Sequence, residues 1–135
     1  MSSESFVMTS AGKTAGQAFK RAVARALYDH GHAGYTGTIA EKDGYRLYRR
    51  PAIAKLNPFD LVEIALHPAR RAGAEMSTEE RRMLDKIQAE TNSKHDPCAA
   101  LRLTDKEAEA IPHSWMRLEL KPGESLFVFF GWASS

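Results

Sequence analysis

The feature that most constrains this chain is a continuous apolar run late in the sequence. Residues 125–132 read Ser-Leu-Phe-Val-Phe-Phe-Gly-Trp, without a charged side chain. A strand with one face in water alternates apolar and polar residues, whereas a strand covered on both faces does not alternate. The run therefore predicts a strand in the centre of a sheet, which the rest of the chain has to cover.

Three segments carry helix signals. A helix is predicted over residues 15–29, where apolar residues recur on one helical face. Asn57-Pro58 starts a second helix, with asparagine as the cap and proline at the first helical position. Ser77-Thr-Glu-Glu80 is a capping box that starts a third. The apolar positions of the first helix are Phe19, Val23, Ala26 and Leu27, padded by Ala15, Ala18 and Ala22.

Several shorter segments read as strands. Asp43-Gly44 is a hairpin signal between residues 36–39 and the alternating residues 45–49. Further strands are predicted at residues 98–103 and 115–120. Residues 1–12, with the apolar patch Phe6-Val7-Met8, form either an edge strand or a loose N-terminal arm.

These elements predict the fold class. Runs of strands and helices without strict alternation indicate an α+β protein. We expect a single compact domain over residues 1–135, with a largely antiparallel sheet of about four to five strands packed with three helices. A chain of 135 residues matches the usual size of one domain. Its single cysteine excludes an internal disulfide and a cysteine-rich zinc site.

Charge is unevenly distributed along the chain. The net charge of +2 combines a basic first half, +5 over residues 1–73, with an acidic second half, −3 over residues 74–135. Such asymmetry marks a polyanion-facing surface in some proteins and is ordinary variation in others. No apolar run is long enough to span a bilayer, and no signal peptide is recognisable, so we expect a cytoplasmic protein with no membrane partner.

The best nucleic-acid signal is a basic strand. Arg46, Arg49 and Arg50 lie next to Tyr45 and Tyr48. Arginine binds phosphate and tyrosine stacks on bases, so the three arginines are candidate contacts for a nucleic acid or another polyanion. A solvated edge strand that is protected by charge has the same pattern.

A second candidate is the loop after the first helix. His32, Tyr35, Thr36 and Thr38 lie among glycines, which let a backbone approach a ligand closely. We take these four as candidate ligand-binding residues, and a glycine-rich turn that packs the first helix is the alternative. The adjoining segment Asp29 to His32 has two histidines and an aspartate, but no partner motif completes a metal site. No metal or other cofactor is therefore expected.

Gly12-Lys13-Thr14 is half of a phosphate-binding loop. The full motif needs a glycine five residues before the Gly-Lys pair, where this chain has Val7. We expect Thr14 to cap the first helix, while Lys13 favours anions near the helix start.

Two segments carry a resemblance. Tyr28-Asp-His-Gly-His32 with Gly34-Tyr-Thr-Gly-Thr-Ile-Ala-Glu-Lys42, and the closing Phe129-Phe-Gly-Trp-Ala-Ser134, resemble small uncharacterised accessory proteins of bacteriophages and mobile elements. The resemblance covers about a third of the chain and carries over no catalytic residue. It implies a phage-derived accessory gene whose product acts in the host cytoplasm, with host defence machinery among the targets of such proteins.

The functional expectation is therefore a phage-type accessory protein that acts by binding and not by catalysis. We expect its partner to be a host factor, a nucleic acid or a nucleotide-like ligand. One role that fits this expectation is counter-defence, in which the protein acts against the host's defence machinery. The alternative is a small enzyme or metal-binding protein centred on Asp29 to His32 and Tyr35 to Thr38. A homodimer is a further expectation, because Phe127, Phe129 and Trp132 form an apolar end.

Overall fold

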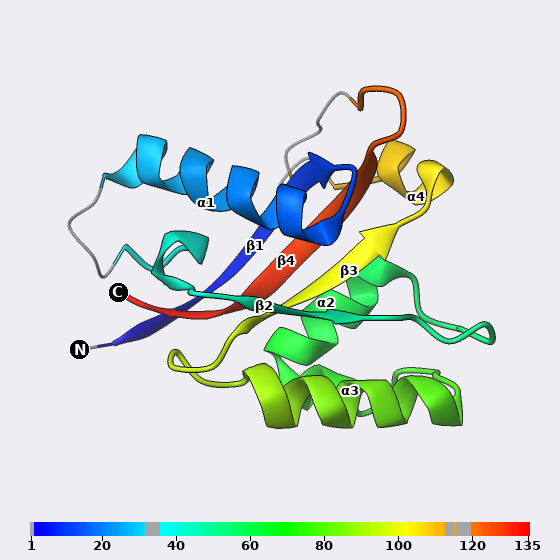
Figure 1. Ribbon diagram of the computed structural model, residues 1–135. Helices are drawn as coiled ribbons and strands as arrows, with labels where there is room; N and C mark the ends of the chain where they lie inside the picture. Colours follow the sequence, from blue (N-terminus) through cyan, green and yellow to red (C-terminus); the bar gives the residue numbers. More distant parts are fainter. Residues whose placement is uncertain (1, 32–35, 113–114, 116–119) are drawn as a thin grey trace.

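The described part of the chain forms one mixed sheet of four strands in the order β1-β4-β3-β2 (Figure 1). The computed structural model describes residues 2–31, 36–112, 115 and 120–135. The strands are β1 (Ser3–Gly12), β2 (Tyr45–Tyr48), β3 (Cys98–Leu103) and β4 (Ser125–Ser134). β4 pairs antiparallel with β1 and β3, and β2 pairs parallel with β3. The predicted single α+β domain with a largely antiparallel sheet and three packed helices is confirmed.

Helices cover both faces of the sheet (Figure 1). α1 (Ala15–His30) packs on one face, and α2 (Pro58–Leu66) and α3 (Thr78–Thr91) pack on the other. The caps form as predicted, since the side chains of Thr14, Asn57 and Ser77 each accept a hydrogen bond from a backbone N–H three residues later. The short elements are η1 (Ile39–Glu41), η2 (Pro68–Arg71) and α4 (Asp105–Glu109).

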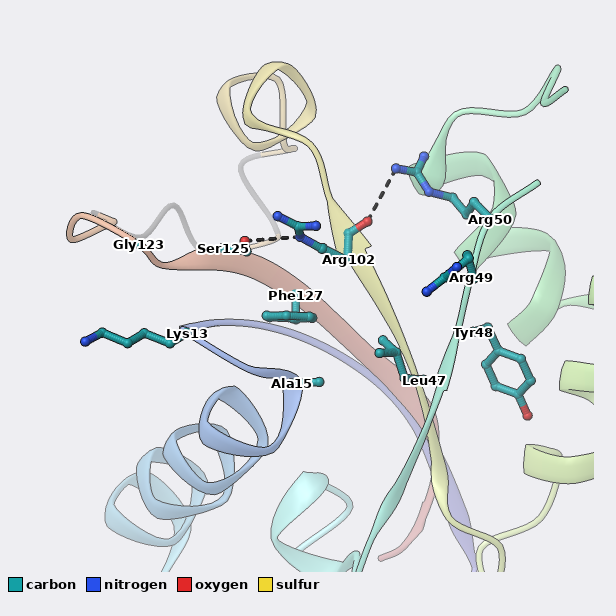
Figure 2. A pocket seen from close by; sticks show the side chains of 10 residues that line it. All are labelled: Lys13, Ala15, Leu47, Tyr48, Arg49, Arg50, Arg102, Gly123, Ser125 and Phe127. Atoms are coloured by element: carbon teal, nitrogen blue, oxygen red, sulfur yellow. Dashed lines mark hydrogen bonds between the residues drawn. The ribbon is translucent and has the colours of Figure 1, made fainter. Parts of the chain in front are cut away.

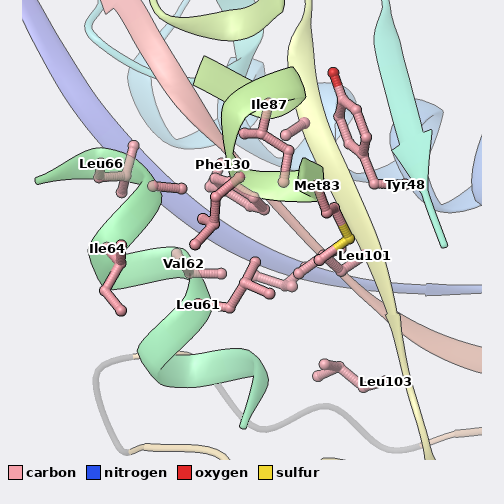
Figure 3. Packing of buried hydrophobic residues seen from close by; sticks show 14 of the residues in the cluster. Tyr48, Leu61, Val62, Ile64, Leu66, Met83, Ile87, Leu101, Leu103 and Phe130 are labelled. Carbon is pink, nitrogen blue, oxygen red and sulfur yellow. The ribbon is translucent and has the colours of Figure 1, made fainter. Parts of the chain in front are cut away.

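β4 is the predicted central strand. Leu126, Val128 and Phe130 lie in the core against α2 and α3, as Figure 3 shows for Phe130, whereas Phe127 and Phe129 lie in the core against α1. All five side chains are buried, which explains why positions 126–130 are all apolar. Phe127 and Phe129, which suggested a surface for a second copy, are therefore used inside one chain.

The N-terminal segment is an edge strand. β1 pairs with β4 over its whole length, from Ser3 opposite Ser134 to Gly12 opposite Ser125. Of the two alternatives for residues 1–12, the strand is therefore the one that the structure adopts. This pairing joins the first and last strands of the chain, and all other elements lie between them in sequence.

The buried face of α1 is made of alanines. Ala18, Ala22 and Ala26 are almost fully buried, whereas Phe19 and Val23 are only half-buried at the sides of this stripe. Ala18 and Ala22, which we expected to pad the stripe, thus form its centre together with Ala26. The reason is the sheet below, because Phe127 and Phe129 already fill the space and only small side chains let the helix approach.

The predicted hairpin at Asp43-Gly44 is wrong. Ile39 to Glu41 form the 3₁₀ turn η1, and β2 pairs with β3 and not with the segment before it. The Thr38 hydroxyl accepts a hydrogen bond from the Ala40 N–H at 3.2 Å, which closes a turn in place of a strand. A turn signal does not fix which strand β2 pairs with, and its partner β3 lies about fifty residues further along the chain.

The strand predicted at residues 115–120 lies largely outside the described residues. Trp115 is described and is buried, with its ring 5.0 Å from that of Phe59 in an edge-on arrangement. No helix in the described ranges is long and apolar enough to cross a bilayer.

A buried carboxylate ties the loop before α2 to the start of α3. Glu80 is fully buried, and its oxygens accept backbone N–H bonds from Lys55 at 2.8 Å, Leu56 at 2.9 Å and Ser77 at 2.8 Å. Burial alone would raise the pKa of Glu80, but these hydrogen bonds outweigh it and hold the pKa below its usual range. The ionised carboxylate is therefore favoured in the folded protein.

We expect Glu80→Gln to lower the free energy of unfolding at neutral pH by about 1–3 kcal/mol, because buried donors lose a charged acceptor. A carboxyl whose folded pKa is depressed stabilises above its unfolded pKa and loses that contribution as pH falls. The gap between wild type and Glu80→Gln should therefore shrink between about pH 6 and about pH 3. Urea denaturation at several pH values measures it. Glu79→Gln, an exposed neighbour in the same turn, is the control. A gap that does not change with pH contradicts this role.

Candidate functional site

A concavity lined by several basic residues lies at one end of the sheet (Figure 2). Its volume is about 730 Å³, within the usual range for small-ligand pockets. It opens where β1, β2 and β3 end and where β4 begins. The lining residues are Lys13, Ala15, Leu47, Tyr48, Arg49, Arg50, Arg102, Gly123, Ser125 and Phe127. We call this the basic pocket.

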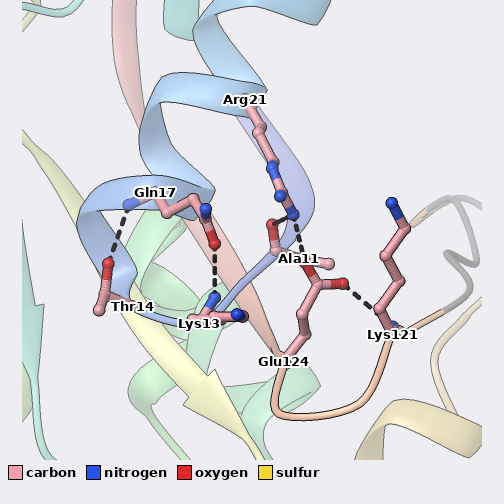
Figure 4. Close-up of polar contacts among 7 residues, drawn as sticks. All are labelled: Ala11, Lys13, Thr14, Gln17, Arg21, Lys121 and Glu124. Atoms are coloured by element: carbon pink, nitrogen blue, oxygen red, sulfur yellow. Dashed lines mark hydrogen bonds and ion pairs between the residues drawn. The ribbon is translucent and has the colours of Figure 1, made fainter.

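Lys13 reaches the basic pocket because β1 turns directly into α1. The turn is tight, since a Cβ on Gly12 would lie 2.7 Å from the Ala18 nitrogen and 2.9 Å from the Thr14 oxygen. The Lys13 N–H is donated to Gln17 Oε1 at 2.8 Å (Figure 4). The strand runs up to Gly12, so no loop is left to wrap a phosphate, and Lys13 contributes only its side chain at the pocket rim.

Arg102 stands near the carboxyl end of β3. It lies on the same sheet face as Cys98 and Ala100, which pack against α1, because side chains two residues apart share a face. Its Nε donates to Ser125 Oγ at 3.1 Å on the adjacent strand. Figure 2 shows its guanidinium next to Phe127, between Lys13 on one side and Arg49 on the other.

The structure separates the three arginines of the predicted basic strand. Arg46 lies 3.5 Å from Glu90, on the α3 side of the sheet. Arg50 donates two hydrogen bonds to the carboxylate of Glu107, one of them at 2.6 Å. Arg49 is exposed and lines the basic pocket. Of the three, Arg49 is therefore the one that keeps its charge available to a ligand.

The Arg50–Glu107 pair also organises α4. Glu107 accepts the Thr104 N–H at 2.9 Å, and Thr104 Oγ1 caps the helix. Burial would raise the pKa of Glu107, but Arg50 and the Thr104 N–H hold the pKa below its usual range. Arg50 thus supports the wall of the basic pocket, and most of its charge is neutralised.

Three cations of the pocket have no acidic partner. Within the described ranges, no carboxylate forms an ion pair with Lys13, Arg49 or Arg102. Cations gathered around a concave surface create a positive potential that attracts anions. The arrangement can hold a phosphate or carboxylate group through charge-assisted hydrogen bonds.

A separate network fixes the rim at Gly123 (Figure 4). Arg21 of α1 donates to the Ala11 carbonyl of β1 at 3.1 Å and to Glu124 at 2.5 Å. Glu124 also accepts the Lys121 N–H at 3.0 Å. The bond from Arg21, followed by that from Lys121, holds the pKa of Glu124 below its usual range. The network fastens the turn before β4 to α1, so the rim is held in place.

The described part of the predicted ligand loop, from Thr36 onward, lies at the opposite end of β4. The Gly37 N–H donates to the Ser134 carbonyl, whereas Ser125 lines the basic pocket. A ten-residue strand is about 30 Å long, so one small ligand cannot touch both places.

The threonines of that loop bond to each other and to Glu41. Thr36 Oγ1 donates to Glu41 Oε2 at 2.7 Å and lies 2.7 Å from Thr38 Oγ1. These bonds close the turn around η1. His32 and Tyr35, the other two candidates, lie outside the described residues. A ligand role for the loop stays a prediction.

The alternative centred on Asp29 to His32 also stays a prediction. Asp29 and His30 are exposed at the end of α1, and His32 lies outside the described residues. Among the residues that the structure places, no group of three or more His, Cys, Asp or Glu side chains could hold a metal ion.

Cys98 is fully buried on the α1 side of β3. Burial raises the pKa of its thiol to about 12, which keeps the sulfur in its less nucleophilic form. Lys42 is buried nearby, and its ammonium donates to the carbonyls of Lys94 at 3.1 Å and Asp96 at 2.6 Å. Both side chains hold the start of β3 in place.

We expect the Cys98 thiol to react with a maleimide or with Ellman's reagent only when the protein opens, because the thiolate is disfavoured and the sulfur is covered. Labelling at neutral pH should be slower than that of free cysteine by at least about 100-fold and should speed up with urea. Labelling as fast as that of the free amino acid contradicts this burial.

Sequence reasoning found part of the basic pocket and missed the rest. It singled out Lys13 and Arg49 as anion-binding side chains in two separate segments, and it missed Arg102 and Leu47. One signal was present for Arg102, which is the only charged residue in the predicted strand Cys98 to Leu103. Leu47 had none, since one exposed leucine in a strand is ordinary.

Comparison with known proteins gave no match to a protein-family model, a curated protein or a solved structure.

The tight turn at Gly12 should be needed for the pocket wall. We expect Gly12→Ala to destabilise the protein by about 1–3 kcal/mol, because the added methyl group would press on backbone atoms of Thr14 and Ala18. Gly44→Ala is the control, since a Cβ there meets nothing within 4 Å, and its effect should stay within about 0.5 kcal/mol. Thermal and urea unfolding measure both. Equal effects of the two substitutions would count against the close packing.

Proposed function

We propose that this chain is a phage-type accessory protein that acts by binding, and that the basic pocket binds a partner carrying phosphate groups. The single observation that supports the proposal is the gathering of Lys13, Arg49 and Arg102 around one concavity, from three segments distant in sequence and without acidic partners among the described residues. Unpaired cations repel one another and cost stability, so their gathering is more easily explained by a ligand than by folding.

The chemistry of the three cations favours phosphate. Arginine offers a planar fork that matches phosphate oxygens, and lysine adds a point charge. The terminal nitrogens of Arg102 have no partner among the described residues, because only its Nε is used, by Ser125. Nucleic acids and nucleotide-like ligands both belong to the class of partners that this pocket would accept.

The resemblance to phage accessory proteins supplies the setting of the proposal. In that setting the protein works in the cytoplasm of a host cell, and its phosphate-bearing partner belongs to the host, including its defence machinery. A host protein is the competing partner class, and it would contact a wider surface than this pocket.

The test is binding of two phosphate probes, inorganic tripolyphosphate and a single-stranded DNA decamer, measured by calorimetry at about 50 and 200 mM salt. At least one probe should bind, and its affinity should fall with salt, because phosphate contacts release counterions. Arg49→Ala and Arg102→Ala should each weaken that binding by roughly tenfold, since a hydrogen bond to a charged group contributes about 1.5–3 kcal/mol.

Arg46→Ala is the matched control. It removes the same charge from the same strand, but Arg46 is paired with Glu90 on the other side of the sheet. Its effect should stay within about twofold. An affinity that does not change with salt concentration would refute the basic pocket as the binding site. An equal loss of affinity in Arg46→Ala, Arg49→Ala and Arg102→Ala would refute it as well. Absence of binding to both probes would leave a host protein as the partner.

A further inference from the structure

The basic pocket has an apolar wall as well as a cationic one. Ala15, Leu47 and Phe127 line it together with Lys13, Arg49 and Arg102. Leu47 is 52% exposed and is one of three large hydrophobic side chains exposed in the described part of the chain, the others being Tyr28 and Ile53. Of these three, Leu47 lines the basic pocket.

The apolar wall and the cationic wall together favour a ligand that has both an apolar surface and an anionic group. Exposing an apolar side chain to water has a cost that is removed when a ligand covers it. Figure 2 shows Leu47 and Phe127 on the α1 side of the sheet, below the Arg102 guanidinium. A bound molecule could place an anionic group at Arg102 and an apolar or planar body against Leu47. An inorganic anion would use only the first wall.

The charge pattern around the pocket indicates one ligand and not a long strand. Proteins that bind single-stranded nucleic acid follow its backbone with a continuous basic groove. Here the neighbouring basic side chains Arg21, Arg46 and Arg50 are each paired with a carboxylate, of Glu124, Glu90 and Glu107 respectively. These three arginines therefore do not extend the cationic surface of the pocket. Its volume of about 730 Å³ suits one small molecule.

We infer that the ligand of the basic pocket is a small molecule of the nucleotide class, with its phosphate at Arg102, Arg49 and Lys13 and its base against Leu47. This inference rests on the proposed function and narrows it to one ligand class. An extended nucleic acid strand is the alternative that the experiment has to separate.

Calorimetry with the four nucleoside 5′-monophosphates, the four parent nucleosides, ribose 5-phosphate, tripolyphosphate and the DNA decamer tests the inference. At least one monophosphate should bind one to one. Its affinity should exceed that of its parent nucleoside and of ribose 5-phosphate by tenfold or more, because neither of those can use both walls.

Two variants locate the walls. Leu47→Ser should weaken the monophosphate roughly tenfold and leave tripolyphosphate within twofold, whereas Arg102→Ala should weaken both. Ile53→Ser is the matched control, since Ile53 is exposed outside the pocket, and it should change neither affinity. Circular dichroism and thermal melting verify that each variant is folded.

The outcomes separate the two proposals. A decamer that binds more tightly than every monophosphate, with several nucleotides covered per protein, overturns the inference and leaves the proposed function standing. The inference is also overturned, and the proposed function left standing, if no monophosphate binds more tightly than ribose 5-phosphate. The same holds if Leu47→Ser binds the monophosphate as tightly as the wild type does. Absence of binding to every phosphate probe overturns both.

Discussion

Burial of β4 on both faces and both edges is the constraint on which the rest of the structure depends. On one face of the strand, a layer has to cover Phe127 and Phe129. On the other face, a second layer has to cover Leu126, Val128 and Phe130. The first layer is α1 with its alanine stripe, and the second is α2 with α3. The strand also needs a partner on each edge, which β1 and β3 provide. The ends of the chain are thereby paired across the sheet.

This arrangement also produces the basic pocket. β1, β2 and β3 run in the same direction, since β1 and β3 both oppose β4 and β2 follows β3. Three strands therefore end at one side of the sheet, and the residues at or just beyond their ends gather there. Sites in open α/β sheets commonly occupy the same position, outside the carboxyl ends of parallel strands. The pocket is where side chains can converge without being buried in the core.

Local elements could be predicted from sequence, whereas strand partners could not. The three helices and their caps depend on residues within a few positions of one another, so Thr14, Asn57 and Ser77 were sufficient to place them. The hairpin at Asp43-Gly44 failed because a turn signal does not name the partner of the strand that follows. The arginines at positions 46, 49 and 50 looked alike in sequence. Their differing availability depends on Glu90 and Glu107, which come from distant elements.

The sequence by itself determined that β4 is central, that three helices form where their caps and apolar spacing place them, and that the first half is net basic and the second half net acidic. Each of these follows from composition or short-range pattern. Only the tertiary structure decided that β2 joins β3 in parallel, that Arg102 lines one concavity with Lys13 and Arg49, and that Gly37 lies at the other end of β4. These are contacts between distant segments, which are set by how the layers cover β4, and no local pattern encodes them.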